Sequence, residues 1–363
     1  MTDFVYKLSL KSSDKTLDCD HEHGSIAHDA LRPAVSDAEA GVMEKQVIYR
    51  DMADCLTSNS SANVAAGIST AVVGAIGNTV GIILMMLILK TPSFHNAFGY
   101  LCISHLVSHI GVYSANIFWA APALILEFDH SITHSFFGVL AGVIENTFWY
   151  AAIYSLLQMS LNRLIAIAFP LKYNTIFSPR NLTFGIAAVW TLSVSHCCIY
   201  FWSGCHFLFS VSQLSWVYPE TECGEIISFY LDFCLSIFLI TAVFIIDAFT
   251  FVFIRRRAKE LSRTCATNTQ EEANFKKNII FFIQGCLGAI NQALGIFFYH
   301  YFIRTGSTKW QRFAGTSLIF QFCHITDALI TIIFIKPVRD QLCHSLHLRK
   351  ETTKIIMVKD SAH

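Results

Sequence analysis

Two histidines stand four residues apart within an apolar stretch of the sequence. His105 and His109 would lie one turn apart on the same face of a helix, and such pairs can bind a transition metal. A membrane enzyme built on a histidine cluster would need further ligands beside them, but His196, His300 and His324 are dispersed. Packing or hydrogen bonding therefore fits the pair better, and we expect no metal, no cofactor and no enzymatic activity.

Asp327 is a carboxylate inside another apolar stretch. Counted from the ends of their stretches, Asn78, His105 and Asp327 lie roughly 13 to 18 Å deep at about 1.5 Å of helix rise per residue. A carboxylate in hydrocarbon is costly unless it is paired or takes up a proton. We expect Asp327 to contact Asn78, a histidine such as His105, water or sodium; alternatively it packs as a neutral hydrogen-bonded helix contact.

Arg163 stands at the end of a long apolar stretch. An arginine there can extend its charge toward the lipid headgroups, which alone would account for its position. The surrounding residues form a more specific pattern, Asn162-Arg163-Leu-Ile-Ala-Ile-Ala-Phe-Pro170-Leu-Lys172-Tyr173.

The composition places these residues in a membrane protein. Hydrophobic residues make up 53% of 363 positions, charged residues 14%, and the mean hydropathy is +0.48. A soluble chain would carry about 25% charged residues, so the apolar excess requires a lipid bilayer. The basic residues flank apolar stretches, which argues against nucleic acid as a partner.

Seven apolar stretches are each long enough to cross a bilayer, which takes roughly 20 helical residues. They cover residues 63–89, 97–124, 136–169, 182–208, 225–254, 277–303 and 312–335. The sequence therefore predicts an all-α membrane protein, a seven-transmembrane helix bundle of the rhodopsin-like kind. Its expected parts are a flexible extracellular tail (1–62), the bundle (63–335) and a cytoplasmic tail (336–363).

Lysine and arginine predict the orientation of the bundle. They concentrate after the first, third, fifth and seventh stretches, most densely as Arg255, Arg256 and Arg257. The positive-inside rule puts these segments in the cytoplasm and the amino terminus outside. Lys45 and Arg50, before the first stretch, favour the opposite orientation, but the larger number of basic residues in the other segments outweighs them.

The pattern from Asn162 to Tyr173 resembles the signature at the inner end of the third helix of rhodopsin-like G-protein-coupled receptors. With Asn before Arg and FPLKYNTIFSP following, it looks like the nematode serpentine receptor class X family. Further matching positions are Gly77-Asn78, the FGYLCISH string at 98–105, and Cys205, Trp216 and Cys223 in one loop. The resemblance covers roughly residues 65–340.

The sequence departs from typical rhodopsin-like receptors at several positions. Asn162 replaces the usual acidic residue, so the ion pair with the neighbouring Arg163 is missing. The sixth stretch has no Trp-x-Pro, and Asp327-Ala328-Leu-Ile-Thr331 stands in place of Asn-Pro-x-x-Tyr. Without those prolines, activation kinks must arise elsewhere or be smaller.

The resemblance implies a heterotrimeric G protein as partner. Arg163 would hold the inner ends of the third and sixth helices together at rest and offer a surface to the G protein when they separate. Asn162, Pro170 and the basic residues Arg255, Arg256 and Arg257 would belong to the same coupling surface.

Glu145 is the expected ligand contact. It lies 18 residues before Arg163, about 27 Å along a helix, the spacing of the acidic residue that binds the amine in aminergic receptors. The candidate walls around it are Trp149, Asn291, Gln292, Tyr299 and His324. A structural hydrogen bond from Glu145 to a neighbouring helix is an equal alternative.

The outer loop carries a candidate disulfide. The class X pattern has cysteines at Cys205 and Cys223, and a bridge would restrain a loop of about 18 residues by roughly 3 kcal/mol. Two free thiols are the alternative. Asn59-Ser60-Ser61 is a glycosylation sequon that an outside tail would allow.

A short amphipathic helix is expected after the seventh stretch. Val338, Leu342 and Leu346 recur every fourth position, which suits a helix on the inner membrane surface. Cys343 beside it is either palmitoylated or a free thiol.

The resemblance leads us to expect a chemosensory G-protein-coupled receptor for a small molecule, in the plasma membrane or the ciliary membrane of a sensory neuron. The alternative is a ligand-gated channel or transporter. The sequence shows no inverted halves, paired broken helices or ring of like charges that would favour it.

Overall fold

The structure is a computed structural model that describes residues 38–263, 269–336 and 338–343. Its contacts divide the chain into two units, Met1–Ala62 and Asn63–His363. In its described part the first unit is the start of one long helix, α3 (Ala38–Lys90). The second unit holds the elements that position the functional residues.

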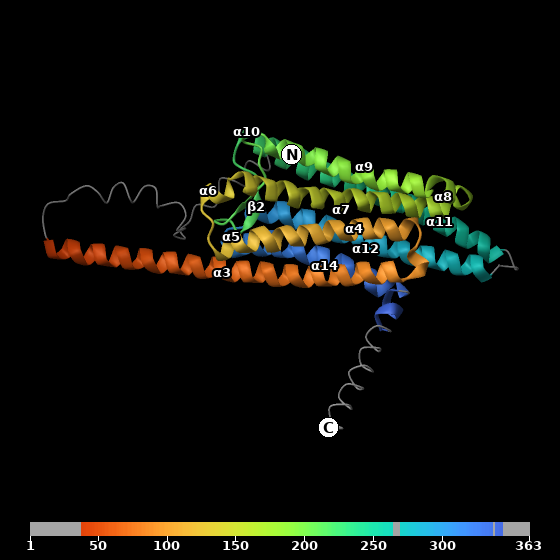
Figure 1. Cartoon of the computed structure of the whole chain (residues 1–363), viewed down its shortest axis with the longest axis horizontal. Helices are drawn as coiled ribbons and strands as arrows, with labels where there is room; N and C mark the ends of the chain where they lie inside the picture. The colour runs from red at the N-terminus through yellow and green to blue at the C-terminus, as the bar shows by residue number, and fades with distance from the viewer. Residues whose placement is uncertain (1–37, 264–268, 337, 344–363) are drawn as a thin grey trace, which may run out of the picture. The chain divides into compact units, whose positions relative to one another are not determined.

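Seven helical segments of the described part are long and apolar enough to cross a membrane (Figure 1). They are Ser60–Lys90, Ala97–Ile125, Phe136–Ala168, Pro179–Phe201, Glu222–Lys259, Phe275–Thr305 and Lys309–Phe334. The predicted all-α membrane bundle with seven spans is therefore confirmed.

Each span is built from one or more helices. The first is the later part of α3, and the others are α4 (Ala97–Ala115) with the π-helix η2 (Asn116–Ala120) and α5 (Ala121–Ile125), α7 (Phe136–Ala168), α9 (Pro179–Cys197) with η3 (Cys198–Phe201), α10 (Glu222–Ile226) with the π-helix η4 (Ile227–Cys234) and α11 (Leu235–Arg263), α12 (Thr269–Thr305), and α13 (Lys309–Phe313) with the π-helix η5 (Ala314–Leu318) and α14 (Ile319–Phe334). Short helices η1 (Pro92–Phe94), α6 (His130–Thr133) and α8 (Pro170–Ile176) connect them.

Polar caps and prolines set several helix ends. Asn96 Oδ1 accepts the Gly99 N–H at 3.1 Å at the start of α4, and Ser135 Oγ accepts the Gly138 N–H at 3.3 Å at the start of α7. Pro170 and Pro179 stand in the first turn of α8 and α9, where the missing N–H costs nothing.

Helix α7 lies at the centre of the bundle. It packs against α4, α9, α11 and α12, and most of its residues are buried (Figure 1). By contrast, α3 exposes Ile68, Val72 and Ile76 at four-residue spacing. Such a large apolar stripe is stable only against lipid or another apolar surface.

The fourth span ends earlier than the sequence predicts. We expected it to run over 182–208, but the helix stops at Phe201 and the chain turns at Gly204, with φ +80°. The apolar residues that follow belong to an antiparallel hairpin of β1 (Leu208–Ser210) and β2 (Ser215–Val217). Phe207, Leu208 and Phe209 are buried in this hairpin, and a short apolar run does not reveal whether it is buried in a helix or a strand.

The extracellular tail expected over residues 1–62 stays a prediction, and its second half overlaps a helix. Helix α3 begins at Ala38, so the backbone of residues 38–62 is helical. Absence of an apolar stripe argues against packing but not against helix, because a helix that is already nucleated extends at little cost. The expectation for residues 1–37 falls outside the described residues.

After the seventh span, residues 338–343 are helical. Val338 is buried, Leu342 is half-buried and Cys343 is exposed, and Leu346 falls outside the described residues. The amphipathic helix at the membrane surface stays a prediction.

Gly142 of α7 lets the hairpin approach the bundle, because a Cβ at this position would stand 1.7 Å from the Phe207 carbonyl oxygen. We expect Gly142→Ala to lower the unfolding free energy by about 1–3 kcal/mol, the usual cost of overpacking. The control is Gly295→Ala, whose Cβ would meet Cys323 Sγ at an ordinary 3.4 Å. Thermal unfolding in detergent measures both, and equal melting temperatures would show that the hairpin does not depend on this contact.

Candidate functional site

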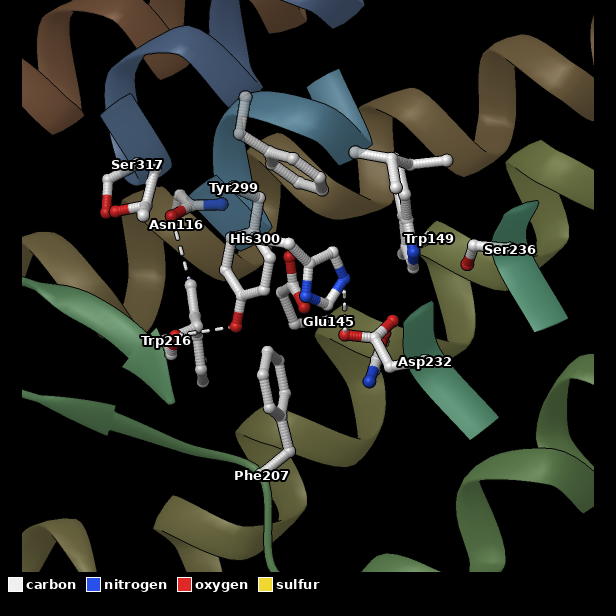
Figure 2. A pocket seen from close by; sticks show the side chains of 14 residues that line it. Asn116, Glu145, Trp149, Phe207, Trp216, Asp232, Ser236, Tyr299, His300 and Ser317 are labelled. Atoms are coloured by element: carbon white, nitrogen blue, oxygen red, sulfur yellow. Dashed lines mark hydrogen bonds and ion pairs between the residues drawn. The ribbon is translucent and has the colours of Figure 1, made fainter. Parts of the chain in front are cut away.

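A cavity lies between α7, α11, α12 and α14 and is closed on one side by the hairpin (Figure 2). The cavity has a volume of about 40 Å³. Its lining residues are Asn116, Glu145, Asn146, Trp149, Phe207, Trp216, Asp232, Ser236, Ile296, Tyr299, His300, Thr316, Ser317 and Phe320. Five of these residues carry the aromatic rings of Phe, Trp or Tyr, and they would enclose the apolar part of a small molecule.

Two acidic side chains line the cavity. Asp232 Oδ2 lies 3.7 Å from His300 Nε2, and its Oδ1 lies 3.3 Å from the Tyr150 hydroxyl. The Glu145 carboxylate has no hydrogen-bond partner among the described residues, although its side chain is buried and lines the cavity. No lysine or arginine is among the described lining residues. Among the described residues, the ionisable lining groups are therefore acidic, apart from the His300 imidazole.

The hairpin is fixed over the cavity by its own polar contacts. Trp216 Nε1 donates to Asn116 Oδ1 at 3.2 Å, and the Tyr299 hydroxyl donates to the Trp216 carbonyl at 3.1 Å. Cys205 and Cys223 form a disulfide that ties the chain before β1 to α10. A ligand would therefore meet a tethered wall instead of a free loop.

The expected ligand residues divide into two groups. Glu145, Trp149 and Tyr299 line the cavity, but Asn291, Gln292 and His324 do not. Asn291 Nδ2 donates to the Cys323 carbonyl, and Gln292 is fully buried. They lie about two helical turns below Tyr299 on α12, so a choice by polarity alone mixed two levels of the bundle.

At the other end of α7, Arg163 forms a buried ion pair with Asp247 of α11. Its Nη2 lies 3.2 Å from Asp247 Oδ1 and 3.4 Å from Oδ2, and both side chains are 4% exposed. The Ser160 hydroxyl donates to Oδ1 at 2.8 Å. One carboxylate thus satisfies two polar groups of α7.

Helix α12 contacts this pair through a glycine. A Cβ at Gly285 would stand 2.2 Å from the Arg163 Cζ atom, so only glycine leaves room for the guanidinium. The next residue, Cys286, places its Sγ 3.7 Å from Asp247 Oδ2. The third and sixth spans therefore do meet at Arg163, but its anionic partner belongs to the fifth.

A second cavity, with a volume of about 330 Å³, opens beside Arg163. Asn162 lines it and donates from Nδ2 to the Tyr173 hydroxyl at 3.1 Å, which joins α7 to α8. Burial raises the pKa of Tyr173, so its hydroxyl stays protonated. Pro170, Lys277 and others complete the lining.

The basic residues of α11 lie at the same end of the bundle. Arg255 and Arg256 are exposed, and their guanidinium groups lie 5.5 Å and 6.0 Å from the rings of Phe251 and Phe253. Arg257 is half-buried. These contacts keep charge near the helix surface, where a partner could meet it.

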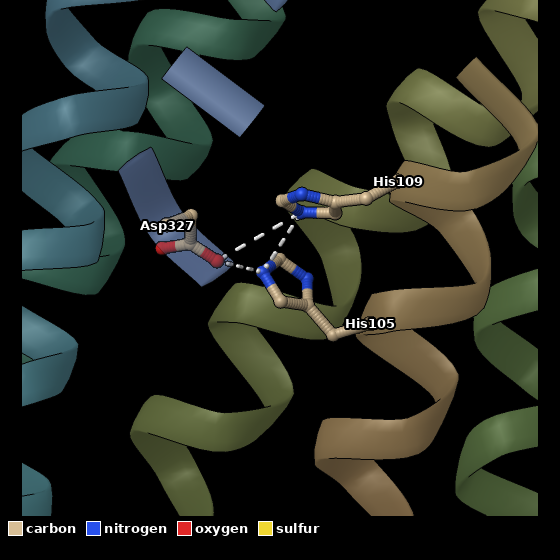
Figure 3. A group of neighbouring side chains, drawn as sticks. All are labelled: His105, His109 and Asp327. Carbon is tan, nitrogen blue, oxygen red and sulfur yellow. Dashed lines mark hydrogen bonds and ion pairs between the residues drawn. The ribbon is translucent and has the colours of Figure 1, made fainter. Parts of the chain in front are cut away.

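The middle of the bundle holds the expected polar network in altered form (Figure 3). His105 Nε2 lies 3.0 Å from Asp327 Oδ2, and His109 joins them. Asn78 does not, because its Nδ2 donates to Ser114 Oγ at 3.4 Å. Asn78 lies at a depth similar to that of Asp327, but residues at equal depth contact each other only when their side chains lie on facing sides of their helices.

The sequence matches a family model described as "Serpentine type 7TM GPCR chemoreceptor Srx" over residues 70–334. The chain belongs to this family of serpentine chemoreceptors. Serpentine receptor class X 45 of Caenorhabditis elegans is 27% identical over 53% of this chain and 57% of its own length. Serpentine receptor class X-43 of the same organism is 27% identical over 58% and 65%. The aligned part therefore spans under two thirds of each relative.

Two further proteins are similar to this chain in sequence or in fold. Human olfactory receptor 4K1 is 29% identical over 44% of this chain and 48% of its own length. The crystal structure of squid rhodopsin superposes with a TM-score of 0.65 at 16% identity, covering 78% of this chain and 80% of that one. The latter shows the fold alone. The family consists of receptors and not of enzymes, and the channel alternative gains no support.

Several residues of this class X site were missed from the sequence. Asp247 and Asp232 are single carboxylates within apolar runs, and their isolation was the available signal, because such a residue needs a partner inside the bundle. His300 and Asn116 gave no signal beyond their type. The sequon at Asn59 falls in the backbone of α3, and its side chain is outside the described ones.

A double-mutant cycle tests the Arg163–Asp247 pair. Arg163→Gln or Asp247→Asn alone leaves a buried charge unpaired, which lowers the free energy of unfolding by about 3–5 kcal/mol. The double variant should lose much less unfolding free energy than the two single variants together. Unfolding in detergent micelles measures the coupling. Arg255→Gln, an exposed arginine on α11, should change stability by less than about 0.5 kcal/mol. Strictly additive losses would mean that the two charges do not interact.

Proposed function

We propose that this chain is a chemosensory G-protein-coupled receptor. A small molecule binds in the cavity beside Glu145, and a heterotrimeric G protein binds at the cavity beside Arg163. The charge distribution supports an amino terminus outside the cell and an arginine-rich end in the cytoplasm. The plasma membrane, including the ciliary membrane of a sensory neuron, is the site of action that fits a chemosensory role.

The Arg163–Asp247 pair is the observation that carries this proposal. It joins α7 to α11, touches α12 through Gly285 and borders an open cavity. A helix of a G protein that enters the cavity can offer carbonyl oxygens to the guanidinium in place of Asp247. The pair would then separate as α11 and α12 move, which makes it a two-state contact between the helices.

The ligand class follows from the two carboxylates. Glu145 has no partner among the described residues, and Asp232 has only neutral hydrogen-bonding neighbours or an imidazole. A ligand with a protonated nitrogen would provide the missing positive charge, while Trp149, Phe207 and Trp216 would enclose its apolar part. We therefore propose a small amine or related organic cation.

Coupling is tested by G-protein nucleotide exchange in membranes. Asp247→Asn should raise ligand-independent exchange several-fold because it frees Arg163, and Arg163→Gln should abolish stimulated exchange at equal surface expression. Arg163→Gln combined with Asp247→Asn removes the unpaired carboxylate and should still be inactive. Arg304→Gln, at the opposite end of α12, serves as control. Full stimulation of the double variant would refute a coupling role for Arg163.

The ligand class is tested by screening cationic and neutral small molecules on the wild type. For a cationic agonist, Glu145→Gln should reduce potency at least about tenfold, the effect of losing roughly 1.4 kcal/mol of charge interaction. Asn291→Ala, a polar residue below the cavity, is the control and should leave potency within threefold. Unchanged potency in Glu145→Gln would exclude the amine assignment without affecting the coupling proposal.

A further inference from the structure

Four ionisable side chains meet in the centre of the bundle, below the ligand cavity. His105 and His109 stand one turn apart on α4, and His324 and Asp327 one turn apart on α14. All four are buried, none more than 7% exposed. The ligand and coupling cavities use none of them as lining.

Three of the four point ligand atoms at one another (Figure 3). His105 Nε2 lies 3.0 Å from Asp327 Oδ2 and 3.1 Å from His109 Nε2, and His109 Nε2 lies 3.9 Å from Asp327 Oδ2. A point about 2.0 Å from all three atoms exists inside such a triangle. This agrees with bond lengths of about 2.0–2.1 Å from zinc to imidazole nitrogen and about 2.0–2.2 Å to carboxylate oxygen.

Hydrogen bonds satisfy this triangle only in part. His105 Nε2 contacts both the carboxylate and His109 Nε2, yet it can carry one proton at most. If that proton points to Asp327, His109 Nε2 faces a nitrogen with no free lone pair and no second proton. In addition, His105 Nδ1 and His324 Nε2 have no partner in the described part of the chain. A fully paired structural network would not leave such atoms buried.

A cation at the centre would give the three lone pairs one common partner. His109 would then carry its proton on Nδ1 and donate to His324 Nδ1, which lies 3.2 Å away. A metal-bound histidine commonly donates its other ring nitrogen in this way, and the partner fixes the ring. The arrangement thus supplies a supporting residue as well as the ligands.

The donor set selects the kind of ion. Two imidazoles and one carboxylate suit zinc and other divalent transition metals, whereas sodium, magnesium and calcium prefer oxygen ligands. Arg163 pairs with Asp247 and not with Asp327, so the Asp327 carboxylate is not taken up by this cation. We propose that His105, His109 and Asp327 bind a divalent transition-metal ion, Zn²⁺ by this chemistry, with His324 supporting His109.

The site would be coupled to the ligand cavity through His324. Its ring lies edge-on to Trp149 at 5.8 Å and to Phe320 at 4.8 Å between centroids, and both of these residues line the cavity. A metal that ties α4 to α14 would also fix the floor of the cavity.

Binding is tested on the purified full chain in lipid nanodiscs, with Zn²⁺ titrated against a chromophoric chelator. Because His21, His23 and His28 of the tail can also bind zinc, the result is the difference in bound Zn²⁺ equivalents between each variant and the wild type. His109→Gln should remove one equivalent of bound Zn²⁺, and His324→Gln should weaken that equivalent by about 10- to 100-fold. The matched control replaces His130 and His134, an exposed pair at the same spacing, with Gln and should retain the site.

A second measurement needs no variant. Co²⁺ added to the wild type should give the visible absorption of a four-coordinate ion with nitrogen ligands, and Zn²⁺ should abolish it and raise the melting temperature. Asp327→Asn replaces His109→Gln if the latter fails to fold. The proposal is overturned if the site variants bind as many equivalents as the wild type, or if that Co²⁺ band stays in the His109→Gln protein. Either result leaves the proposed receptor function standing.

Discussion

A guanidinium cannot remain in the interior of a membrane protein without an anion, and this requirement organises one half of the bundle. Arg163 is buried in the last turns of α7, and its guanidinium pairs with Asp247 of α11. Each charge alone would cost several kcal/mol in a low-dielectric interior. The pair therefore fixes how α7 and α11 face each other, and Gly285 lets α12 close on the same point.

The polar residues of α7 and its neighbours form three levels. Glu145 and Asp232 occupy the level of the ligand cavity, the histidine cluster lies at the next, and Arg163 with Asp247 at the last. Since Trp149 touches both the first level and His324, the first two are in contact through one ring. A change in the cavity can thus reach the middle of the bundle without a long path.

How far the sequence allowed prediction depends on the kind of signal. The spans follow from length and hydropathy, because hydrocarbon imposes both, and the family follows from the string around Arg163. The prediction of the end of the fourth span was wrong, because the apolar run Phe207 to Phe209 fits a buried hairpin as well as a buried helix. Glu145 was predicted from its helical spacing to Arg163 and Trp149 from its place beside it on the same helix, whereas Tyr299 was chosen for its polarity. Asp232, His300 and the Arg163–Asp247 pair were not predicted, because contact between residues 84 positions apart depends on how helices rotate against each other.

The neighbour of Arg163 in sequence gives the ion pair its particular meaning. In typical rhodopsin-like receptors the acidic residue before the arginine sits on the same helix, so the two charges travel together when helices move. Here that position is Asn162, which hydrogen-bonds Tyr173 instead. The anion stands on α11, so the pair cannot survive a displacement of α11 from α7 by more than a few ångströms. A contact between helices reports their separation, whereas a contact within one helix does not. Loss of the usual acidic neighbour therefore does not leave Arg163 unrestrained, because the restraint lies between α7 and α11, the interface that opens in the proposed mechanism.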